Sequence, residues 1–374
     1  MKKIPFIVII LLYNVLCLAQ KPFFPVSTDG KVWSFIDDNG KKVLDIKPLL
    51  TDCTIFSEGL AAAKDSLSGS YGYLDEKGAW AIRPQFTEAG NFVNGLAVVG
   101  TACDANCLTE AGGLMIFGYT KVIDKKGKVV LNDNAQEIEP ALRFWFDGYN
   151  DGTLLRVTHG LSVGDIKTMM NRKGEFVGQR SGMCCLTVSD GWIAYNTYQG
   201  NYYTDVNGKI MLKIKNFDRV SPFTEGVAIA TDTSERTFLI DKKGKQLLVL
   251  KNSEYNYAGA VGDGLFRVTF AEHDVYMNLK GKVVIDNAFV SASRFSNGLA
   301  HVEAADNKHY YIDKTAKKVI TIPETNLQDI EYGEFTADGY AFIRSNTGSF
   351  ATQPVIEGVV FKNGTTVWRR TVVE

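Results

Sequence analysis

The sequence predicts an all-β fold made of tandem hairpin repeats, and three observations support this fold class. A turn that begins with Asp or Asn between two apolar strands recurs eight times, at Asp37, Asp75, Asp124, Asn171, Asp205, Asp241, Asn278 and Asp313. Five of the seven intervals between these turns are 34 to 38 residues long, and the other two are 47 and 49 residues. An apolar residue followed three positions later by Gly alternates with the turn, 17 to 20 residues after it.

Residues 122–130, which read VIDKKGKVV, show the repeated turn most clearly. Asp is favoured at the first position of a type I turn because its carboxylate accepts hydrogen bonds from the backbone ahead of it. Gly127, three residues after Asp124, supplies the positive φ that closes the turn. The apolar pairs on both sides are typical of strands. Each copy of this segment therefore predicts a β-hairpin.

Residues 275–313 illustrate a whole unit, for which we predict three strands and an irregular fourth. The strand after the second turn is apolar on both alternating faces and rich in Ala, as in residues 60–63. A strand with one wet face would alternate apolar with polar residues, so we expect sheets stacked on one another. A β-propeller of about eight units satisfies this pattern, and an open β-solenoid is the alternative. The tail at 359–370 is expected to complete a sheet begun near 32–37.

The first 19 residues differ from the rest of the chain. Lys2 and Lys3 precede an apolar run from Ile4 to Leu18, and small residues before Gln20 suit a signal peptidase. The run is shorter than the roughly 20 residues that span a bilayer. We therefore expect residues 1–19 to be a cleaved signal peptide, and residues 20–374 to form a single exported repeat domain without membrane insertion. A net charge of −1 provides no electrostatic case for nucleic acid or an anionic membrane.

Residues 71–99 resemble a unit of the bacterial WG-repeat family. That family runs aromatic-Gly-Tyr-Ile-Asp-x-x-Gly-Lys, then Pro-x-Phe, then Phe-x-x-Gly-Leu-Ala. The matching positions here are Tyr71, Gly72, Tyr73, Asp75, Gly78, Pro84, Phe86, Phe92, Gly95, Leu96 and Ala97. The resemblance extends from about residue 30 to about residue 343, although most units lack the aromatic-Gly dipeptide. It implies an interaction module, and it carries over no catalytic residue.

No motif for nucleophilic, phosphate-binding or zinc-protease chemistry occurs in the sequence, so we predict a non-enzyme without a cofactor. His301, Glu303 and His309 flank one predicted hairpin, where cross-strand pairing can bring them together. A metal site with two histidines and one carboxylate is the functional interpretation of this group. Polar residues on an outer strand are the simpler interpretation, and we predict no metal.

Two insertions, near 101–113 and 143–152, account for the longer intervals and are the predicted binding region. Cys103 and Cys107 in the first insertion can form a local disulfide, or less readily a metal site. Trp145 and Tyr149 beside Asp147 in the second suit a sugar or a protein partner, unless these rings point into the core. Tyr195, Tyr198, Tyr202 and Tyr203 present the same two alternatives.

The sequence therefore predicts an exported, non-catalytic binding or scaffolding module of the cell envelope, found in the periplasm, on the outer surface or outside the cell. Its expected partner is a protein or a glycan. The alternative is a propeller-type glycan hydrolase with carboxylates on the rim that carries the insertions. Such an enzyme needs two carboxylates a few ångströms apart, and the sequence does not nominate a pair.

Overall fold

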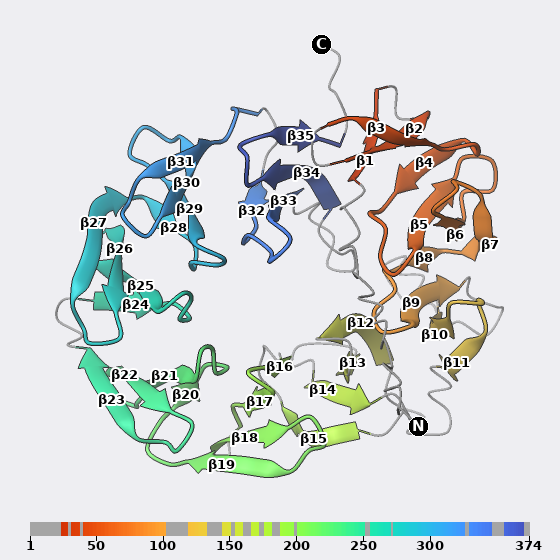
Figure 1. Ribbon diagram of the computed structural model, residues 1–374. Coiled ribbons are helices and arrows are strands. Elements are labelled where there is room, and N and C mark those ends of the chain that lie inside the picture. Colours follow the sequence, from red (N-terminus) through yellow and green to blue (C-terminus); the bar gives the residue numbers. More distant parts are fainter. Residues whose placement is uncertain are drawn as a thin grey trace, which may run out of the picture.

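The computed structural model describes residues 24–28, 31–37, 40–101, 119–132, 144–150, 154–159, 166–171, 176–181, 188–197, 200–250, 255–270, 272–325, 329–345 and 355–369. Within these residues the regular structure consists of β-strands, which form nine sheets arranged in a ring (Figure 1). The described part of the chain contains no helix that is long and apolar enough to cross a membrane.

We number the sheets by chain order. Sheet 1 has β1 (Phe24–Ser27), β2 (Trp33–Ile36) and β3 (Lys42–Asp45); sheet 2 has β4 (Leu50–Cys53), β5 (Leu60–Asp65), β6 (Tyr71–Asp75) and β7 (Trp80–Phe86); sheet 3 has β8 (Glu88–Ala89), β9 (Leu96–Thr101), β10 (Tyr119–Asp124) and β11 (Val129–Asn132). Sheet 4 has β12 (Phe144–Asn150), β13 (Leu154–His159), β14 (Ile166–Asn171) and β15 (Phe176–Ser181); sheet 5 has β16 (Val188–Ser189), β17 (Trp192–Tyr195), β18 (Asn201–Asp205) and β19 (Ile210–Ile214); sheet 6 has β20 (Arg219–Val220), β21 (Val227–Thr231), β22 (Thr237–Asp241) and β23 (Gln246–Leu250). Sheet 7 has β24 (Tyr255–Ala258), β25 (Leu265–Phe270), β26 (His273–Asn278) and β27 (Val283–Phe289); sheet 8 has β28 (Ser291–Ala292), β29 (Leu299–Glu303), β30 (His309–Asp313) and β31 (Lys318–Thr321); sheet 9 has β32 (Ile330–Tyr332), β33 (Tyr340–Ser345), β34 (Val355–Phe361) and β35 (Thr366–Trp368).

Each sheet is an antiparallel meander in which consecutive strands pair. In the four-stranded sheets the first strand lies nearest the centre of the ring and the fourth lies at its margin (Figure 1). The predicted all-β, propeller-like class is confirmed, and the closed arrangement replaces the open solenoid. The structure also provides the fourth strand, which was expected to be irregular, in every described sheet except sheet 1.

The described ring has nine sheets where the sequence predicted about eight repeats, because the ninth turn lacks Asp. The Phe361 N–H donates to the carbonyl oxygen of Thr365, and the Gly364 N–H donates to that of Phe361. The same two bonds join Asp124 to Lys128 and Gly127 to Asp124 in sheet 3. Sheet 9 thus has the repeated turn with Phe at its first position, which a search for Asp or Asn overlooks.

The repeated Asp holds the turn between the third and fourth strands. In sheet 3 the Oδ1 atom of Asp124 accepts bonds from the backbone N–H groups of Lys126 and Lys128, both at 2.9 Å. Gly127 has a φ of 80°, in the left-handed region that Gly adopts without steric cost. These contacts confirm the predicted role of Asp in turn formation. Asn278 makes the same bonds through its own Oδ1 atom, which explains why Asn replaces Asp without loss of the turn.

The second motif forms the hairpin between the first and second strands. Asn94 and Gly95 have φ values of 49° and 81°, and the backbones of Val93 and Leu96 exchange two hydrogen bonds around them. Two consecutive positive φ values define a type I′ turn, whose twist matches that of the adjoining strands. The same pair of left-handed residues recurs in other sheets, at 58–59, 190–191, 225–226, 263–264 and 297–298.

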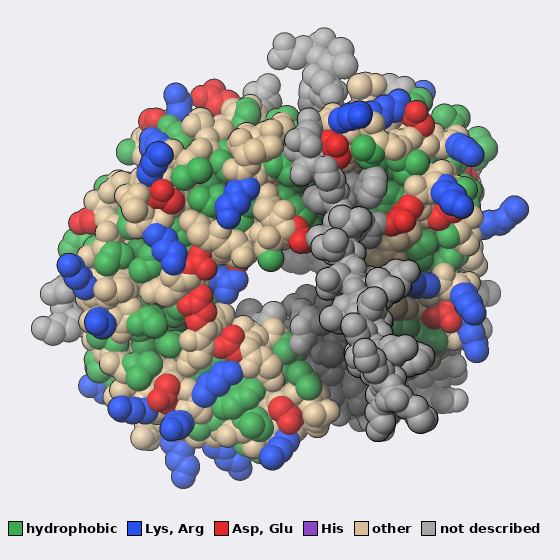
Figure 2. Space-filling model, viewed as in Figure 1, with side chains coloured by type: hydrophobic (Ala, Val, Ile, Leu, Met, Phe, Trp, Pro, Cys, Tyr) green, Lys and Arg blue, Asp and Glu red, His purple; other side chains and the backbone are tan. Residues whose placement is uncertain are grey.

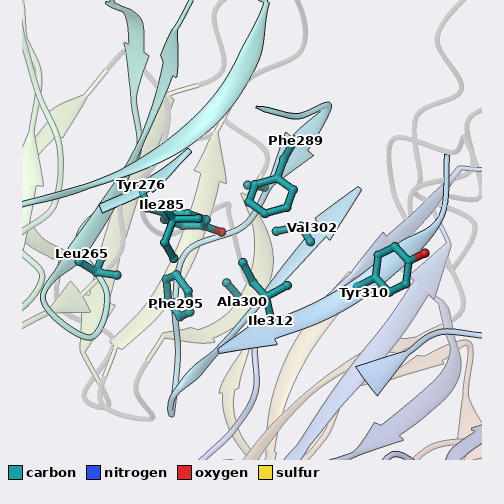
Figure 3. Packing of buried hydrophobic residues seen from close by; sticks show 10 residues of the cluster. Leu265, Tyr276, Ile285, Phe289, Phe295, Ala300, Val302, Tyr310 and Ile312 are labelled. Carbon is teal, nitrogen blue, oxygen red and sulfur yellow. The ribbon is translucent and has the colours of Figure 1, made fainter. Parts of the chain in front are cut away.

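The hydrophobic core lies between neighbouring sheets. Between sheets 7 and 8, Tyr276 and Ile285 face Ala300, Val302 and other buried side chains of the next sheet (Figure 3). The Ala-rich second strand of sheet 2 is buried on both faces, with Ala61, Ala62 and Ala63 each at 0% exposure. The prediction that both faces of these strands are covered is confirmed. Small residues there allow the sheets to approach closely.

A Tyr two residues before the turn Asp or Asn joins each of four sheets to the next one. The Tyr276 hydroxyl donates to the carbonyl oxygen of Ser293 at 2.6 Å, and its ring lies 4.7 Å from the ring of Phe295. The same bond and ring contact occur in the pairs Tyr73 with Gly90 and Phe92, Tyr203 with Ser221 and Phe223, and Tyr311 with Gly333 and Phe335. Burial raises the pKa of Tyr276, so its hydroxyl remains a hydrogen-bond donor.

Contacts between sheets 9 and 1 close the ring. Phe24 and Ile36 of sheet 1 share a buried cluster with Val359 and Phe361 of sheet 9. The prediction that the tail completes the sheet begun near 32–37 is wrong, since 359–361 and 366–368 lie in sheet 9 and sheet 1 has its own three strands. One backbone bond, from the Ser27 N–H to the Arg369 carbonyl oxygen, joins the two sheets.

Arg369, directly after the last strand, connects the end of the ring to its beginning. Its side chain donates to the Cys53 carbonyl oxygen at 2.7 Å and pairs with the Asp52 carboxylate, both in β4 of sheet 2. The guanidinium also lies over the Trp33 ring, 5.0 Å from its centroid. One buried cation therefore contacts sheets 1 and 2 from the end of sheet 9.

Candidate functional site

The ring has two faces that differ in how the chain crosses them. Because every sheet is a meander, the connections from first to second strand and from third to fourth strand of the four-stranded sheets lie on one face, which we call the turn face, and the turn between β2 and β3 of sheet 1 is the equivalent of the third-to-fourth turns. The connections from second to third strand and from one sheet to the next lie on the opposite face, which we call the connection face. Binding residues are commonly found on connections held by a rigid scaffold, so the face with the more variable connections is the candidate binding face.

The turn face is the more regular of the two. The connection between the last two strands is four residues long in eight sheets and five in sheet 1, and the first-to-second connections of the four-stranded sheets range from two residues (190–191) to seven (333–339). An acidic side chain at the first-to-second turn often bonds to the same turn of the next sheet, as when Glu58 accepts from the Gly95 N–H at 2.8 Å. Lys125 pairs with Glu58 as well. Burial alone would raise the pKa of Glu58, but these two contacts outweigh it and the pKa is lowered. The acidic residues of these turns therefore join sheets together.

The connection face is variable. Connections between second and third strands range from two residues (271–272) to 17 (102–118), and those between sheets range from one residue (290) to 11 (133–143). The insertion predicted near 101–113 lies in the 102–118 connection. Cys103 and Cys107 are in this connection, outside the described residues, so their predicted disulfide stays a prediction. The longest connections and the widest variation in length thus occur on this face.

The second predicted insertion contains a strand of the ring. Phe144–Asn150 is β12, the first strand of sheet 4, and pairs with β13. Trp145 and Tyr149 are opposite Thr158 and Leu155, and Asp147 lies where the pairing register shifts. The structure therefore places the backbone of all three predicted binding residues in one strand. Their side chains lie outside the described part of the chain.

The second aromatic group is part of the core. Tyr195 and Tyr203 are fully buried, and Tyr202 is 8% exposed. The rings of Tyr195 and Tyr202 stack at 4.8 Å, and the Tyr203 hydroxyl bonds to the Ser221 carbonyl oxygen of the next sheet. Tyr198 lies outside the described residues. For the three described tyrosines the core interpretation is correct.

His301 and His309 are in contact between sheets 8 and 9. The Nε2 atom of His301 lies 3.1 Å from the Nδ1 atom of His309, so one proton is shared in an N–H···N bond. Both rings contact Tyr332 of β32, each with its centroid 4.6 Å from that of the tyrosine; His301 is stacked on it and His309 is tilted against it. Glu303, the third predicted member, instead accepts a bond from the Ser291 hydroxyl at 3.0 Å. Sequence reasoning thus found the pair but missed Tyr332, which belongs to the next sheet.

His301 is held in its neutral form by its surroundings. Burial, and then the adjacent His309, lower the pKa of His301 to about 3. Among the described residues no group of three or more His, Cys, Asp or Glu side chains is placed to hold a metal ion. The described residues of this cluster can accept a hydrogen bond or stack with an aromatic partner.

The fold and its two faces define a β-propeller-type repeat protein whose sheets present unequal connections on one face. Four segments, at residues 33–65, 71–100, 203–231 and 276–308, match the family model described as WG containing repeat, which supports a WG-repeat protein. Each matched segment begins in the second or third strand of one sheet and ends in or just after the second strand of the next. The sequence repeat thus bridges two sheets. None of the curated proteins matches the chain in sequence.

Solved structures share the ring architecture at low sequence identity. The chain is similar to a crystal structure of a eukaryotic initiation factor, with a TM-score of 0.56 and 12% identity over 94% of this chain and 95% of that one. It is also similar to BamB from Moraxella catarrhalis, with a TM-score of 0.38 and 14% identity over 79% and 94% of the two chains. The C-terminal WD40 domain of Sif2 gives a TM-score of 0.41 and 10% identity over 86% and 93%. The first of these likenesses supports the fold alone.

Proposed function

We propose that the chain is an exported, non-catalytic binding and scaffolding module of the cell envelope, which holds a protein or glycan on its connection face. The observation that carries this proposal is the wide range of connection lengths on that face, from one residue to 17, against two to seven residues on the other. A rigid ring with variable connections on one side suits recognition, because connections change sequence and length without disturbing the sheets.

The non-catalytic part of the proposal is supported by the sequence, which carries no catalytic motif. Several of the ionisable groups that the fold places close together take part in contacts between sheets, as with Lys125 and Glu58 or Arg369 and Asp52. Export is proposed from the apolar run at 4–18 that follows Lys2 and Lys3.

The test is a crosslinking capture with the purified chain from Gln20 onward, offered envelope extract and cell-envelope glycans in parallel. A variant in which residues 103–117 are replaced by a Gly-Ser linker of equal length removes the longest connection. Lys77→Gln on the turn face is the matched control. We expect the linker variant to lose the captured ligand and the control to keep it. Equal capture by the parent chain, the linker variant and the control would refute the proposal that the ligand binds on the connection face. A retained glycan that shortens with time would refute the non-catalytic role.

A further inference from the structure

The outermost strands of the ring repeat a basic and aliphatic pair that the contacts between sheets leave exposed. Four residues after the first residue of the turn there is a Lys, and six residues after it there is an aliphatic side chain. The pairs are Lys41 and Val43, Lys128 and Val130, Lys209 and Met211, Lys245 and Leu247, Lys282 and Val284, and Lys317 and Val319. The six aliphatic side chains are exposed to nearly the same extent, from 40% to 45%.

Each Lys is the last residue of its turn, and the aliphatic residue two positions later lies at the β-bulge where the last strand of the sheet shifts register against its neighbour. Both members of each pair are exposed at the outer edge of their sheet. The turns of sheets 6 and 7 also lie close to the outer strand of the preceding sheet. A Cβ atom at Gly281 of sheet 7 would lie 2.9 Å from Leu248 of sheet 6, and one at Gly244 would lie 3.5 Å from Leu212 of sheet 5. The pairs of consecutive sheets therefore form a continuous margin.

Positive charge is concentrated on one part of this margin, the three turns of sheets 6, 7 and 8. Residues 241–245, 278–282 and 313–317 contain seven lysines against two aspartates, an excess of five positive charges. Two of the lysines, Lys242 and Lys314, bond to backbone carbonyl oxygens of neighbouring sheets. The other five are exposed and form no ion pair within the described residues: Lys243, Lys245, Lys280, Lys282 and Lys317. Lys and Arg side chains project around much of the outer margin (Figure 2).

We propose that this part of the margin, the basic corner of sheets 6–8, contacts the surface of a bilayer that contains anionic phospholipids. The lysines suit phosphate headgroups, and the exposed aliphatic side chains of Leu247, Val284 and Val319 suit the boundary between headgroups and acyl chains. A nucleic acid or another soluble polyanion would use the lysines but leave the aliphatic side chains exposed. The contact is peripheral and uses no membrane-spanning segment. It is independent of the ligand proposed for the connection face.

The test is sedimentation of the chain from Gln20 onward with vesicles of phosphatidylglycerol and phosphatidylcholine in equal parts, and with vesicles of phosphatidylcholine alone. The first variant carries Lys243→Gln, Lys280→Gln and Lys282→Gln. Its matched control carries the same change at Lys41, Lys77 and Lys209, which are equally exposed but lie in turns without an excess of positive charge. A second variant, Leu247→Ser with Val284→Ser, keeps every charge.

We expect binding to the anionic vesicles at low salt and no binding to the neutral ones. Each lysine near an anionic surface contributes about a factor of five in partition, so the first variant should bind about a hundred-fold more weakly. The affinity of the control for anionic vesicles should fall clearly less than that of the first variant. The second variant should also bind these vesicles more weakly than the parent chain. The proposal is overturned if the parent chain does not bind anionic vesicles, or if the first variant and its control lose the same amount of binding. It is also overturned if polyphosphate competes fully while the second variant binds vesicles normally.

Discussion

Replacing His301 by Gln should make the protein less sensitive to acid. The ring of His301 is buried against His309, Tyr311 and Tyr332, and its pKa falls to about 3 against an ordinary value of 6.5. Between these two pH values the unfolded chain binds a proton at His301 that the folded chain excludes. Stability from this group is therefore fully present above pH 6.5 and is lost as the pH falls toward 3.

The size of the effect follows from the shift. One pKa unit corresponds to about 1.4 kcal/mol, so the loss approaches that slope per pH unit once the unfolded histidine is mostly protonated. Between pH 7 and pH 5 the group should cost about 2 kcal/mol in the free energy of unfolding. Gln at this position fits between the same rings without titrating. The drop in stability between these pH values should thus be about 2 kcal/mol smaller in the variant.

The assay is urea unfolding followed by tryptophan fluorescence at pH 7, 6 and 5, which yields the free energy of unfolding at each pH. His273→Gln is the matched control, because His273 is a half-buried histidine on the adjoining sheet that pairs with Asp286 and leaves His301 in place. The control should keep the part of the fall in the free energy of unfolding between pH 7 and pH 5 that His301 causes, because His301 is still present. If His301→Gln shows the same drop in stability as the parent chain, His301 is protonated in the folded state and the argument from burial is wrong.

Three further substitutions test the contacts between sheets, each by urea unfolding. Tyr276→Phe removes the hydroxyl bond to Ser293 and leaves a buried carbonyl without that donor, so it should cost about 1–2 kcal/mol; no change would show that the bond contributes nothing. Arg369→Met keeps the stem but removes the bonds to β4, and should cost about 2–3 kcal/mol while lowering resistance to proteolysis near the sheet 9–sheet 1 junction. Gly281→Ala should cost more than Gly298→Ala. Both residues have positive φ, but only at Gly281 would the added Cβ meet a neighbour, at 2.9 Å, and equal costs would contradict the packing explanation.

Much of the ring is predictable from local chemistry. The turn at Asp124 requires an acceptor at its first position and a left-handed residue at its fourth, so it can be recognised in the sequence wherever it occurs. The type I′ turn at Asn94-Gly95 is equally local. The ninth turn was missed because Phe361 stands where Asp is expected and packs against sheet 1, a contact between residues more than 300 positions apart.

The candidate binding region was less predictable. The segment 143–152 looks like an insertion because it lengthens the spacing, yet its backbone continues the meander as β12. The overall charge of −1 also gave no reason to expect an anionic surface as a partner, since it averages the whole chain. The fold concentrates positive charge that the net charge of the whole chain does not reveal, because the turns of three sheets place their lysines on one margin.

The sequence by itself determined the strand class, the repeat length and the positions of the tight turns, because each depends on hydrogen bonds and backbone angles within a few residues. Tertiary structure alone decided the number of sheets, the closure of the ring through Arg369, and the contact between His301, His309 and Tyr332. It also decided which side chains share a face. These features depend on contacts between sheets that are distant in sequence, where the geometry of the ring sets the distances and local residue preference does not.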